Sequence, residues 1–282
     1  MKCIFTIDVE DWFHILGANQ TPSIRQWDTL PSRVEANFRR LLAIFDEKGI
    51  RTTCFFLGWI AEKYPHLVKE ALDAGHDLAA HGYGHRLAYE MDEREFRADA
   101  AKSKKIIEDL AGRPVNGFRA PGFSVTASTP WFFAALAEAG FAYDSSVFPA
   151  TRGHGGYPTD RLGPHWVGNG AQGIVEFPIS VTKLWGKRMC FFGGGYLRAF
   201  PYYLIKKKAT EVLADNRPVI FYIHPREIDL SQPRLPLSPR RRLKSYLNLK
   251  STEIKLRNLL TDFEWMTIAE YLNEYQDQLE AD

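Results

Sequence analysis

The sequence contains few cysteines, and they lie far apart. Three of its 282 residues are cysteines, at Cys3, Cys54 and Cys190. An odd number of widely spaced cysteines argues against a disulfide framework and against a zinc site built from thiolates. Small disulfide-rich secreted domains and zinc-finger modules are therefore excluded as classes.

Long apolar runs and a secretory leader are absent as well. The most apolar stretch, 131–143, is interrupted by Glu138 and Gly140, whereas a membrane-spanning helix needs about 20 predominantly apolar residues. The opening residues reach Asp8 before an apolar run of signal-peptide length has formed. We therefore expect no transmembrane segment, at most a peripheral membrane contact, and a cytoplasmic location unless an export signal precedes this sequence.

Charge of one sign is scarce too. Lysine and arginine total 36 against 34 aspartate and glutamate residues, a net charge of +2, so no nucleic-acid partner is expected. One basic run stands out near the C-terminal end, formed by Arg240, Arg241, Arg242 and Lys244. Such a run is typical of a solvated helix start, and contact with an anion is the alternative interpretation.

The sequence does contain a regular alternation of strand-like and helix-like segments. Apolar runs of strand length occur at 3–8, 52–57, 76–81, 115–119, 141–144, 174–178, 218–224 and 263–267. Helical patterns lie between or after them, at 32–48, up to 74 with a restart at Pro65, and at 92–110, 130–139, 252–261 and 268–279. Ser32 with Glu35, and Asp92 with Glu95, are spaced as capping boxes.

Repeated strand and helix units predict a parallel sheet, and seven or eight of them in about 250 residues predict an α/β barrel. Three long irregular stretches, at 12–31, 145–173 and 225–251, have the length of functional loops or lids. No linker divides the chain, so we expect one domain over 1–282.

Polar side chains stand at the ends of five predicted strands. They are Asp8 with Glu10 and Asp11, His81 with His85, Arg119, Asp144 and His224. The C-terminal ends of the strands carry the active site in parallel barrels. Because the rest of each strand is apolar, we expect these side chains to meet at one rim.

His81 and His85 enclose two glycines after a strand, which allows both imidazoles to converge on one cation. Two histidines and one carboxylate with open positions suit Zn²⁺ or another first-row divalent ion. The histidine pair alone is a frequent chance pattern, but the acidic cluster after the first strand strengthens the prediction of a metal site.

Arg119 is the natural partner to hold Asp8 ionised, although a lone arginine after a strand is more often a surface ion pair. His224 ends a very apolar strand and could be a core residue or a general acid. Asp144 could orient His224 and raise its pKa, so that it stays protonated near neutral pH.

In order and spacing these residues resemble the five motifs of the NodB-homology polysaccharide deacetylases, carbohydrate esterase family 4. The matching segments are 6–11, 81–85, 119–122, 144–146 and 223–224. The resemblance implies that Asp8 is the catalytic base, that Arg119 orients it, and that His81 and His85 bind metal. It also implies that His224 protonates the leaving amine and that Asp144 tunes His224.

The resemblance further implies a distorted (β/α)7–8 barrel and metal-dependent removal of N-acetyl groups. The cofactor would be a divalent metal, with Zn²⁺ the first choice and Co²⁺, Ni²⁺ or Mn²⁺ as alternatives. Segments 176–178, 193–196, 224–234 and 246–272 resemble a subfamily associated with exopolysaccharide loci and exosortase systems. The portion from about 225 to 282 would be specific to that subfamily.

Two positions depart from the family pattern. Val9 follows Asp8 where many members have a second acid, so the metal ligand could be Glu10, which we favour slightly, or Asp11. Arg226 stands where the subfamily leads us to expect tryptophan, which could change the leaving-group pocket.

The resemblance implies an N-acetylhexosamine glycan, or a precursor of one, as the substrate in exopolysaccharide or cell-surface polysaccharide biosynthesis. Candidate sugar-binding residues are Trp12, His14, Phe123, Trp185, Tyr196 and Arg226, and each aromatic could equally be core packing. The alternatives are a deformylase or deacetylase of a lipid-linked sugar and a catalytically silent carbohydrate-binding relative. Metal-independent hydrolysis of a cyclic amide on the same fold should lack the histidine pair.

Overall fold

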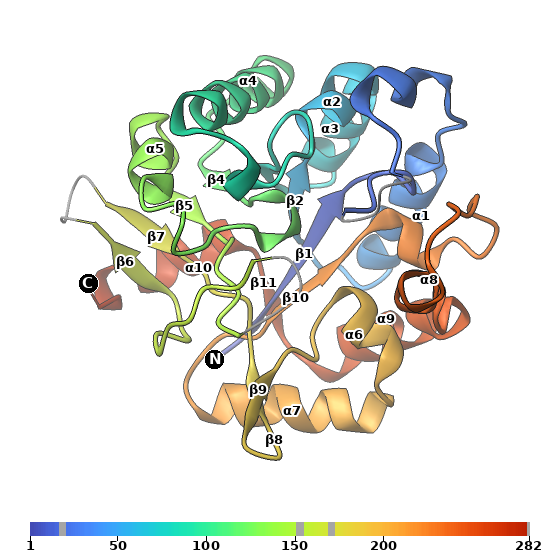
Figure 1. The fold of residues 1–282 in the computed structure, drawn as a ribbon. Coiled ribbons are helices and arrows are strands. Elements are labelled where there is room, and N and C mark those ends of the chain that lie inside the picture. Colours follow the sequence, from blue (N-terminus) through green and yellow to red (C-terminus); the bar gives the residue numbers. More distant parts are fainter. Residues whose placement is uncertain (17–20, 151–154, 169–172, 281–282) are drawn as a thin grey trace.

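The apolar segments of the chain assemble into one curled sheet (Figure 1). The computed structural model describes residues 1–16, 21–150, 155–168 and 173–280. Within these residues nine strands form the sheet, in the order β10-β1-β2-β3-β4-β5-β7-β6, and β11 pairs with β1 beside this path. All pairs are parallel except β6 with β7.

The strands are short, and most fall where the apolar runs predict them. They are β1 (Cys3–Val9), β2 (Thr53–Phe56), β3 (Asp77–Ala80), β4 (Gly117–Phe118), β5 (Tyr143–Asp144), β6 (His165–Val167), β7 (Ile174–Glu176), β10 (Ile220–Ile223) and β11 (Trp265–Met266). A separate hairpin joins β8 (Thr182–Leu184) to β9 (Lys187–Met189).

Helices surround the sheet (Figure 1). They are α1 (Val34–Asp46), α2 (Gly58–Lys63), α3 (Pro65–Asp73), α4 (Glu93–Ala111), α5 (Phe132–Glu138), α6 (Gly194–Ala199), α7 (Tyr202–Ala214), α8 (Pro239–Tyr246), α9 (Leu249–Asp262) and α10 (Ile268–Tyr275). Short 3-10 turns include η1 (Ile24–Thr29), η2 (Ala88–Glu90), η3 (Pro121–Phe123), η5 (Pro225–Ile228) and η6 (Gln276–Gln278). The predicted α/β class and distorted barrel are confirmed, with the sheet curled into a half-barrel.

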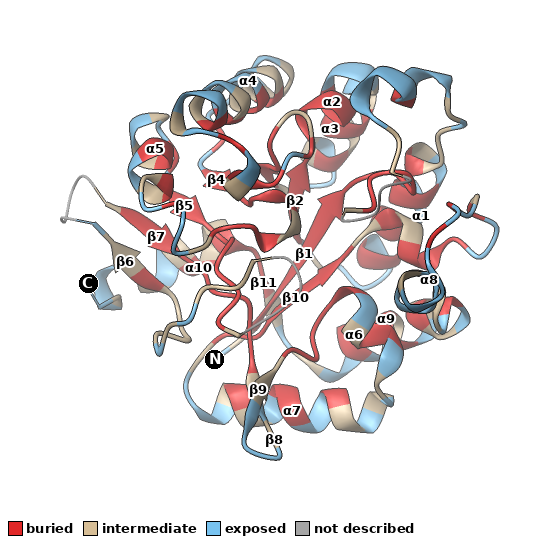
Figure 2. Cartoon of the chain, in the orientation of Figure 1, coloured by how far each residue is buried: buried red, intermediate tan, exposed pale blue. Residues whose placement is uncertain are grey.

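Alternating side chains of β1 serve two different layers, as expected for a strand. Cys3, Phe5, Ile7 and Val9 belong to the main core, which they share with residues of the outer helices. Ile4 belongs to a second cluster with residues of β2, β3, β5 and β10 on the other face of the sheet. Figure 2 shows β1 and its neighbours fully buried, whereas the outer helices are buried on one face only. Asp8 therefore shares the inner face with Ile4.

The structure corrects one predicted helix cap and contains secondary-structure elements that the sequence did not predict. Asp92 caps α4 in the predicted capping box with Glu95, but α1 begins at Val34 and has no cap from Ser32. The Ser32 hydroxyl donates to Asp11 instead. The predictions did not include β6, the hairpin, or the helices α6 and α7, whereas α8 begins at the basic run that the sequence interprets as a helix start. Parts of two predicted irregular stretches, 17–20, 151–154 and 169–172, lie outside the described residues.

Within the described ranges, no helix is both long and apolar enough to cross a membrane.

Candidate active site

A buried ion pair lies at the C-terminal end of β1. Arg119, which follows β4, donates from Nη1 to Oδ1 of Asp8 and to the hydroxyl of Thr6, each at 2.7 Å. The guanidinium stacks over the ring of Phe55, 4.0 Å from its centroid, and its remaining nitrogens donate to Ser145. Arg119 is fully buried, so this is not a surface ion pair. One oxygen of Asp8, Oδ2, is left facing the site.

The loop after β3 turns sharply and delivers His81 and His85. Gly82 has a φ of 68°, and a Cβ there would lie 2.8 Å from Asp99 Oδ2. Asp99, from α4, accepts hydrogen bonds from the backbone N–H groups of Tyr83 and Gly84. His85 also has a positive φ, 53°, which is uncommon for a residue with a side chain. The packing thus holds this loop in a strained conformation in which both imidazoles face Glu10.

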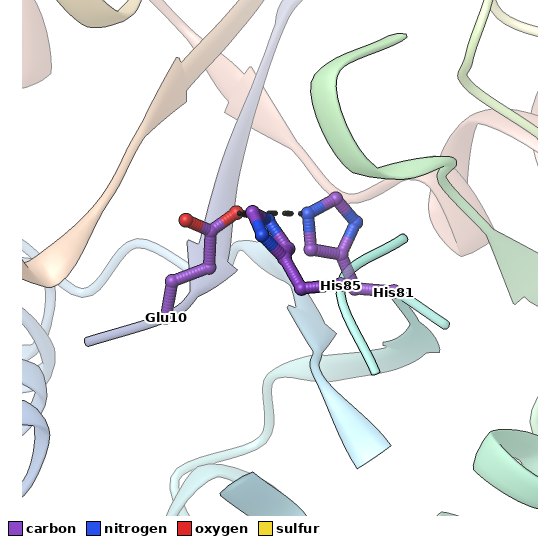
Figure 3. Close-up of side chains that lie close together, drawn as sticks. All are labelled: Glu10, His81 and His85. Atoms are coloured by element: carbon purple, nitrogen blue, oxygen red, sulfur yellow. Dashed lines mark hydrogen bonds and ion pairs between the residues drawn. The ribbon is translucent and has the colours of Figure 1, made fainter. Parts of the chain in front are cut away.

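Glu10 meets these two imidazoles (Figure 3). Its Oε1 lies 3.0 Å from His81 Nε2 and 2.8 Å from His85 Nε2. All three residues are buried, and their potential ligand atoms lie within 4.8 Å of one another. The structure thus brings Glu10, rather than Asp11, to the histidine pair.

The orientation of the His81 ring makes this cluster suited to a cation. His81 Nδ1 donates to the carbonyl of Arg119 at 2.7 Å, so in a neutral ring Nε2 would present a lone pair to the Glu10 oxygen. Two lone pairs at that distance repel unless a proton or a cation lies between them. Two imidazoles and a carboxylate, one imidazole fixed by a backbone carbonyl, are the donors that Zn²⁺ prefers. The residues therefore fit a divalent metal.

Electrostatics favour the charged form of Glu10. Burial raises the pKa of Glu10, but the charges of His85 and His224 and the hydrogen bonds from His81 and His85 outweigh it. The pKa is held well below its ordinary value, so the carboxylate is available as a ligand.

Asp11 points the other way and caps helix α1. Its carboxylate accepts hydrogen bonds from the backbone N–H groups of Arg33 and Val34 and from the hydroxyl of Ser32. Burial raises the pKa of Asp11, and these hydrogen bonds partly offset the rise.

His224 follows β10 and faces Asp8 across the site. Its Nε2 lies 3.8 Å from Asp8 Oδ2 and 3.9 Å from Glu10 Oε1. Its Nδ1 lies 3.2 Å from Oε2 of Glu227. Burial lowers the pKa of His224, but Glu10 and Glu227 outweigh it and raise the pKa above its ordinary value. The shift favours the protonated form of His224.

The prediction that Asp144 orients His224 needs correction, because Glu227 occupies that place. Asp144 accepts from the backbone N–H and the hydroxyl of Ser146. The Ser146 hydroxyl oxygen in turn accepts a hydrogen bond from the backbone N–H of Ala120. The Asp144 loop therefore supports the Arg119 loop. Burial, together with the neighbouring charge of Asp144, raises the pKa of Glu176 well above its ordinary value, so that Glu176 holds a proton beside Asp144.

Glu227 and Arg198 are site residues that the sequence predictions missed. Arg198, from α6, lies 3.1 Å from Glu227 through its Nε and donates to the carbonyls of Lys244 and Ser245. Burial raises the pKa of Glu227, but Arg198 and His224 outweigh it and lower the pKa to about 2. One local signal was available, because an acid three residues after His224 has the spacing of a capping box, which the structure contains.

A cleft of about 540 Å³ opens over Asp8, Glu10, His85 and His224. Four of the predicted sugar-binding residues line it, His14, Phe123, Tyr196 and Arg226. Trp12 and Trp185 do not. The Trp12 indole donates to the carbonyl of Pro31 inside the core, and Trp185 is 93% exposed at the turn of the β8–β9 hairpin. The expectation that these two tryptophans contact a sugar does not agree with these positions.

His14 lines the cleft with its ring held in one orientation. Its Nδ1 accepts the backbone N–H of Asp11 at 3.0 Å, so a neutral ring carries its proton on Nε2. That Nε2 is buried and has no partner among the described residues. Burial, with the charge of His85, holds the pKa of His14 well below its ordinary value, which keeps the ring neutral.

Two family models match adjacent parts of the chain. Residues 23–143 match the model described as polysaccharide deacetylase, and residues 145–273 match a domain of unknown function. A peptidoglycan deacetylase of Helicobacter pylori is 32% identical over 113 residues, 40% of this chain and 38% of that protein. A peptidoglycan-N-acetylglucosamine deacetylase of Bacillus cereus is 32% identical over 82 residues, 29% and 30% of the two chains. The chain thus matches about a third of the length of these relatives.

Solved structures share the fold over nearly the whole chain. A protein from Mycobacterium smegmatis assigned to the polysaccharide deacetylases superimposes with a TM-score of 0.67 and 20% identity, covering 98% of this chain and 90% of its own. PuuE allantoinase superimposes with a TM-score of 0.61 and 17% identity over the same shares. At these identities the likeness establishes the fold alone.

Proposed function

The chain belongs to the NodB-homology family of polysaccharide deacetylases, and from this premise we propose that it is a metal-dependent hydrolase of N-acetylhexosamine units in a glycan or glycan precursor. The observation that carries the proposal is the pairing of Asp8 with His224. The Asp8 carboxylate, paired with Arg119, and the His224 imidazole face each other at 3.8 Å, beside the cluster of Glu10, His81 and His85.

In the proposed reaction Asp8 is the base and His224 the acid. Arg119 occupies Oδ1 of Asp8, which leaves Oδ2 to take a proton from the attacking water. The water oxygen forms the bond to the acetamide carbon, and the carbon–nitrogen bond breaks. His224 delivers the proton on Nε2 to the departing amine, while Glu227 holds Nδ1. Acetate and a free amine are the products.

Glu10, His81 and His85 would hold the metal, with Zn²⁺ the first candidate. When bound, such an ion polarises the carbonyl and lowers the pKa of water. We propose that Asp11 is not a ligand, because its carboxylate already serves three hydrogen-bond donors at α1.

The biological setting is a proposal of its own. We propose that the substrate belongs to the biosynthesis of an exopolysaccharide or another cell-surface polysaccharide. The relatives named as peptidoglycan deacetylases support a cell-surface glycan that contains N-acetylhexosamine. The segments that resemble an exopolysaccharide-associated subfamily support the narrower assignment.

The test is acetate release from N-acetylglucosamine oligomers by protein stripped with a chelator and then reloaded with Zn²⁺, Co²⁺, Ni²⁺ or Mn²⁺. We expect release only after reloading, and a fall in kcat of at least about 10²-fold for Asp8→Asn, since proton transfer contributes ~10²–10⁴-fold in enzymes. Asp73→Asn, the same change at an exposed position, is the control and should match the parent. Metal bound at one equivalent without acetate release from any N-acetylated oligomer would refute the proposed reaction.

A further inference from the structure

One guanidinium that lines the cleft has two nitrogens, Nε and Nη1, without an acceptor among the residues that the structure describes. Arg226 lies on η5, two residues after His224, and lines the cleft. Its Nε and Nη1 are shielded from solvent, yet neither donates a hydrogen bond to the protein. Charged donors that lose water without gaining an acceptor are costly. An anion that approaches Arg226 from the cleft would supply an acceptor for this guanidinium.

The turn that carries Arg226 is fixed. The carbonyl of Arg226 accepts from the side-chain amide of Gln232 at 2.6 Å and from the backbone N–H of Asp229 at 3.2 Å. Pro225 holds the first position of the same turn. These contacts anchor the backbone of Arg226 beside His224. The position from which its side chain extends is therefore fixed.

The carboxylates of the cleft are already engaged elsewhere. Asp8 pairs with Arg119, and Glu10 pairs with the two histidines of the metal cluster. Glu227 is held by His224 and Arg198. None of these three acids hydrogen-bonds Nε or Nη1 of Arg226.

The lining of the cleft carries more positive charge. Arg241 and Lys244, from α8, line the cleft together with Arg226. The neighbouring Arg240 and Arg242 are exposed and do not line it. The basic run of α8 is thus divided between the cleft and the outer surface. Only part of it behaves as the solvated helix start that the sequence favours.

We propose that Arg226, with Arg241 and Lys244, forms a subsite for an oxyanion on the glycan, next to the N-acetylhexosamine unit that is deacetylated. The inference rests on the proposed function and narrows its substrate to an acidic glycan or a phosphorylated glycan precursor. A planar guanidinium matches the oxygens of a carboxylate or a phosphate. The anion is therefore the carboxylate of a uronic acid or a phosphate at the reducing end.

The experiment compares kcat/KM on two matched substrate pairs. The first is a disaccharide of N-acetylglucosamine and glucuronate against its carboxyl-reduced form. The second is N-acetylglucosamine 1-phosphate against the methyl glycoside. We expect at least a tenfold preference for the anionic member of one pair, and the preferred pair identifies the source of the charge. Arg226→Gln should reduce that preference at least tenfold, whereas Arg226→Lys should retain part of it.

Arg242→Gln is the matched control, because it removes the same charge from α8 at an exposed position outside the cleft. Its preference should equal that of the parent. Calorimetry measures the binding of the anionic probes to the parent and to each variant. It separates the proposed anion subsite from the proposed deacetylase activity. Binding that depends on Arg226 without turnover supports the subsite and refutes the deacetylase. Turnover with no preference for the charged member, in parent and Arg226→Gln alike, overturns the subsite and leaves the deacetylase standing.

Discussion

At the scale of single residues, the catalytic proposal depends on how His224 is held. Its Nδ1 lies 3.2 Å from Glu227, and its Nε2 faces Asp8 at 3.8 Å. Glu227 is itself buried and held ionised by Arg198. This chain of contacts fixes the imidazole and keeps its proton on the side of the leaving group. Glu227 is therefore a positioning residue that acts through His224.

Replacing Glu227 by Gln should lower kcat for deacetylation by at least about tenfold, within the ~10²–10⁴-fold that proton transfer contributes in total. The amide keeps the shape but removes the charge that supports the imidazolium. Hydrolysis of p-nitrophenyl acetate should be much less affected, because its leaving group departs without protonation. The measurement is kcat on both substrates.

Glu264→Gln, at an exposed position far from the cleft lining, is the control and should leave both rates unchanged. Equal losses on the amide and the ester would contradict a role for Glu227 through the general acid and would point to a structural defect.

The sequence indicates well which residues at the strand ends form the site, but it does not indicate which side chains they contact. Period-two alternation carries Asp8 and Glu10 to one face of the chain and Val9 and Asp11 to the other, so the choice of Glu10 was within reach of sequence reasoning. The partner of His224 was not, because Asp144 and Glu227 are both acids near a predicted strand end. Only the contacts of Glu227 with His224 and with Arg198 of α6 distinguish them.

At the scale of elements, helix α1 is anchored by side chains from outside the helix. Asp11 accepts the N–H groups of Arg33 and Val34. The guanidinium of Arg33 then pairs with Asp229, from the segment after η5. Asp11 and Asp229 thus join the start of α1 to the ends of β1 and β10, the two strands that carry Asp8 and His224.

Asp11→Ala should lower the free energy of unfolding by about 2 kcal/mol, because an N-terminal cap contributes roughly 0.5–2 kcal/mol and the remaining donors lose a buried acceptor. The zinc content at saturation should stay at the parent value, since Glu10, His81 and His85 remain. Urea denaturation and metal analysis check the two expectations. Asp73→Ala serves as the exposed control. Loss of zinc at full stability would show that Asp11 is a ligand after all.

Helices α6 and α7 escaped prediction for physical reasons. A Cβ on Gly193 would lie 2.2 Å from the ring of Tyr222, so the glycines before α6 serve close packing and look like a loop in sequence. In α7 the buried positions include Lys208, whose ammonium reaches the carbonyl of Lys183 and the carboxylate of Glu211. Because Lys208 stands at a buried position, the helical spacing of apolar residues is interrupted there, and this spacing is the sequence pattern that predicts a helix.

At the scale of the whole molecule, the two matched segments share one sheet. The central strand β1 pairs with β2 on one side and with β10 on the other, and β11 adds to its first residues. The metal cluster comes from β1 and from the loop after β3, whereas His224 follows β10. Neither the first half nor the second half of the chain contains the complete site.

We therefore expect the chain to unfold in a single cooperative transition. Splitting the sheet would expose β1, which is buried along its whole length, so neither half has a stable folded form of its own. Urea curves from tryptophan fluorescence and from far-ultraviolet circular dichroism should coincide. Two separated transitions would show that the segments fold as independent units.

The alternation along β1 also constrains how this site can evolve. A substitution at any one position from Asp8 to Asp11 changes the contacts of that side chain alone. Insertion or deletion of one residue would instead exchange the two faces of everything that follows in the extended chain. Glu10 would then point toward helix α1, and Asp11 would point toward His81 and His85. Lineages can therefore vary which acid stands in this segment far more easily than they can vary its length.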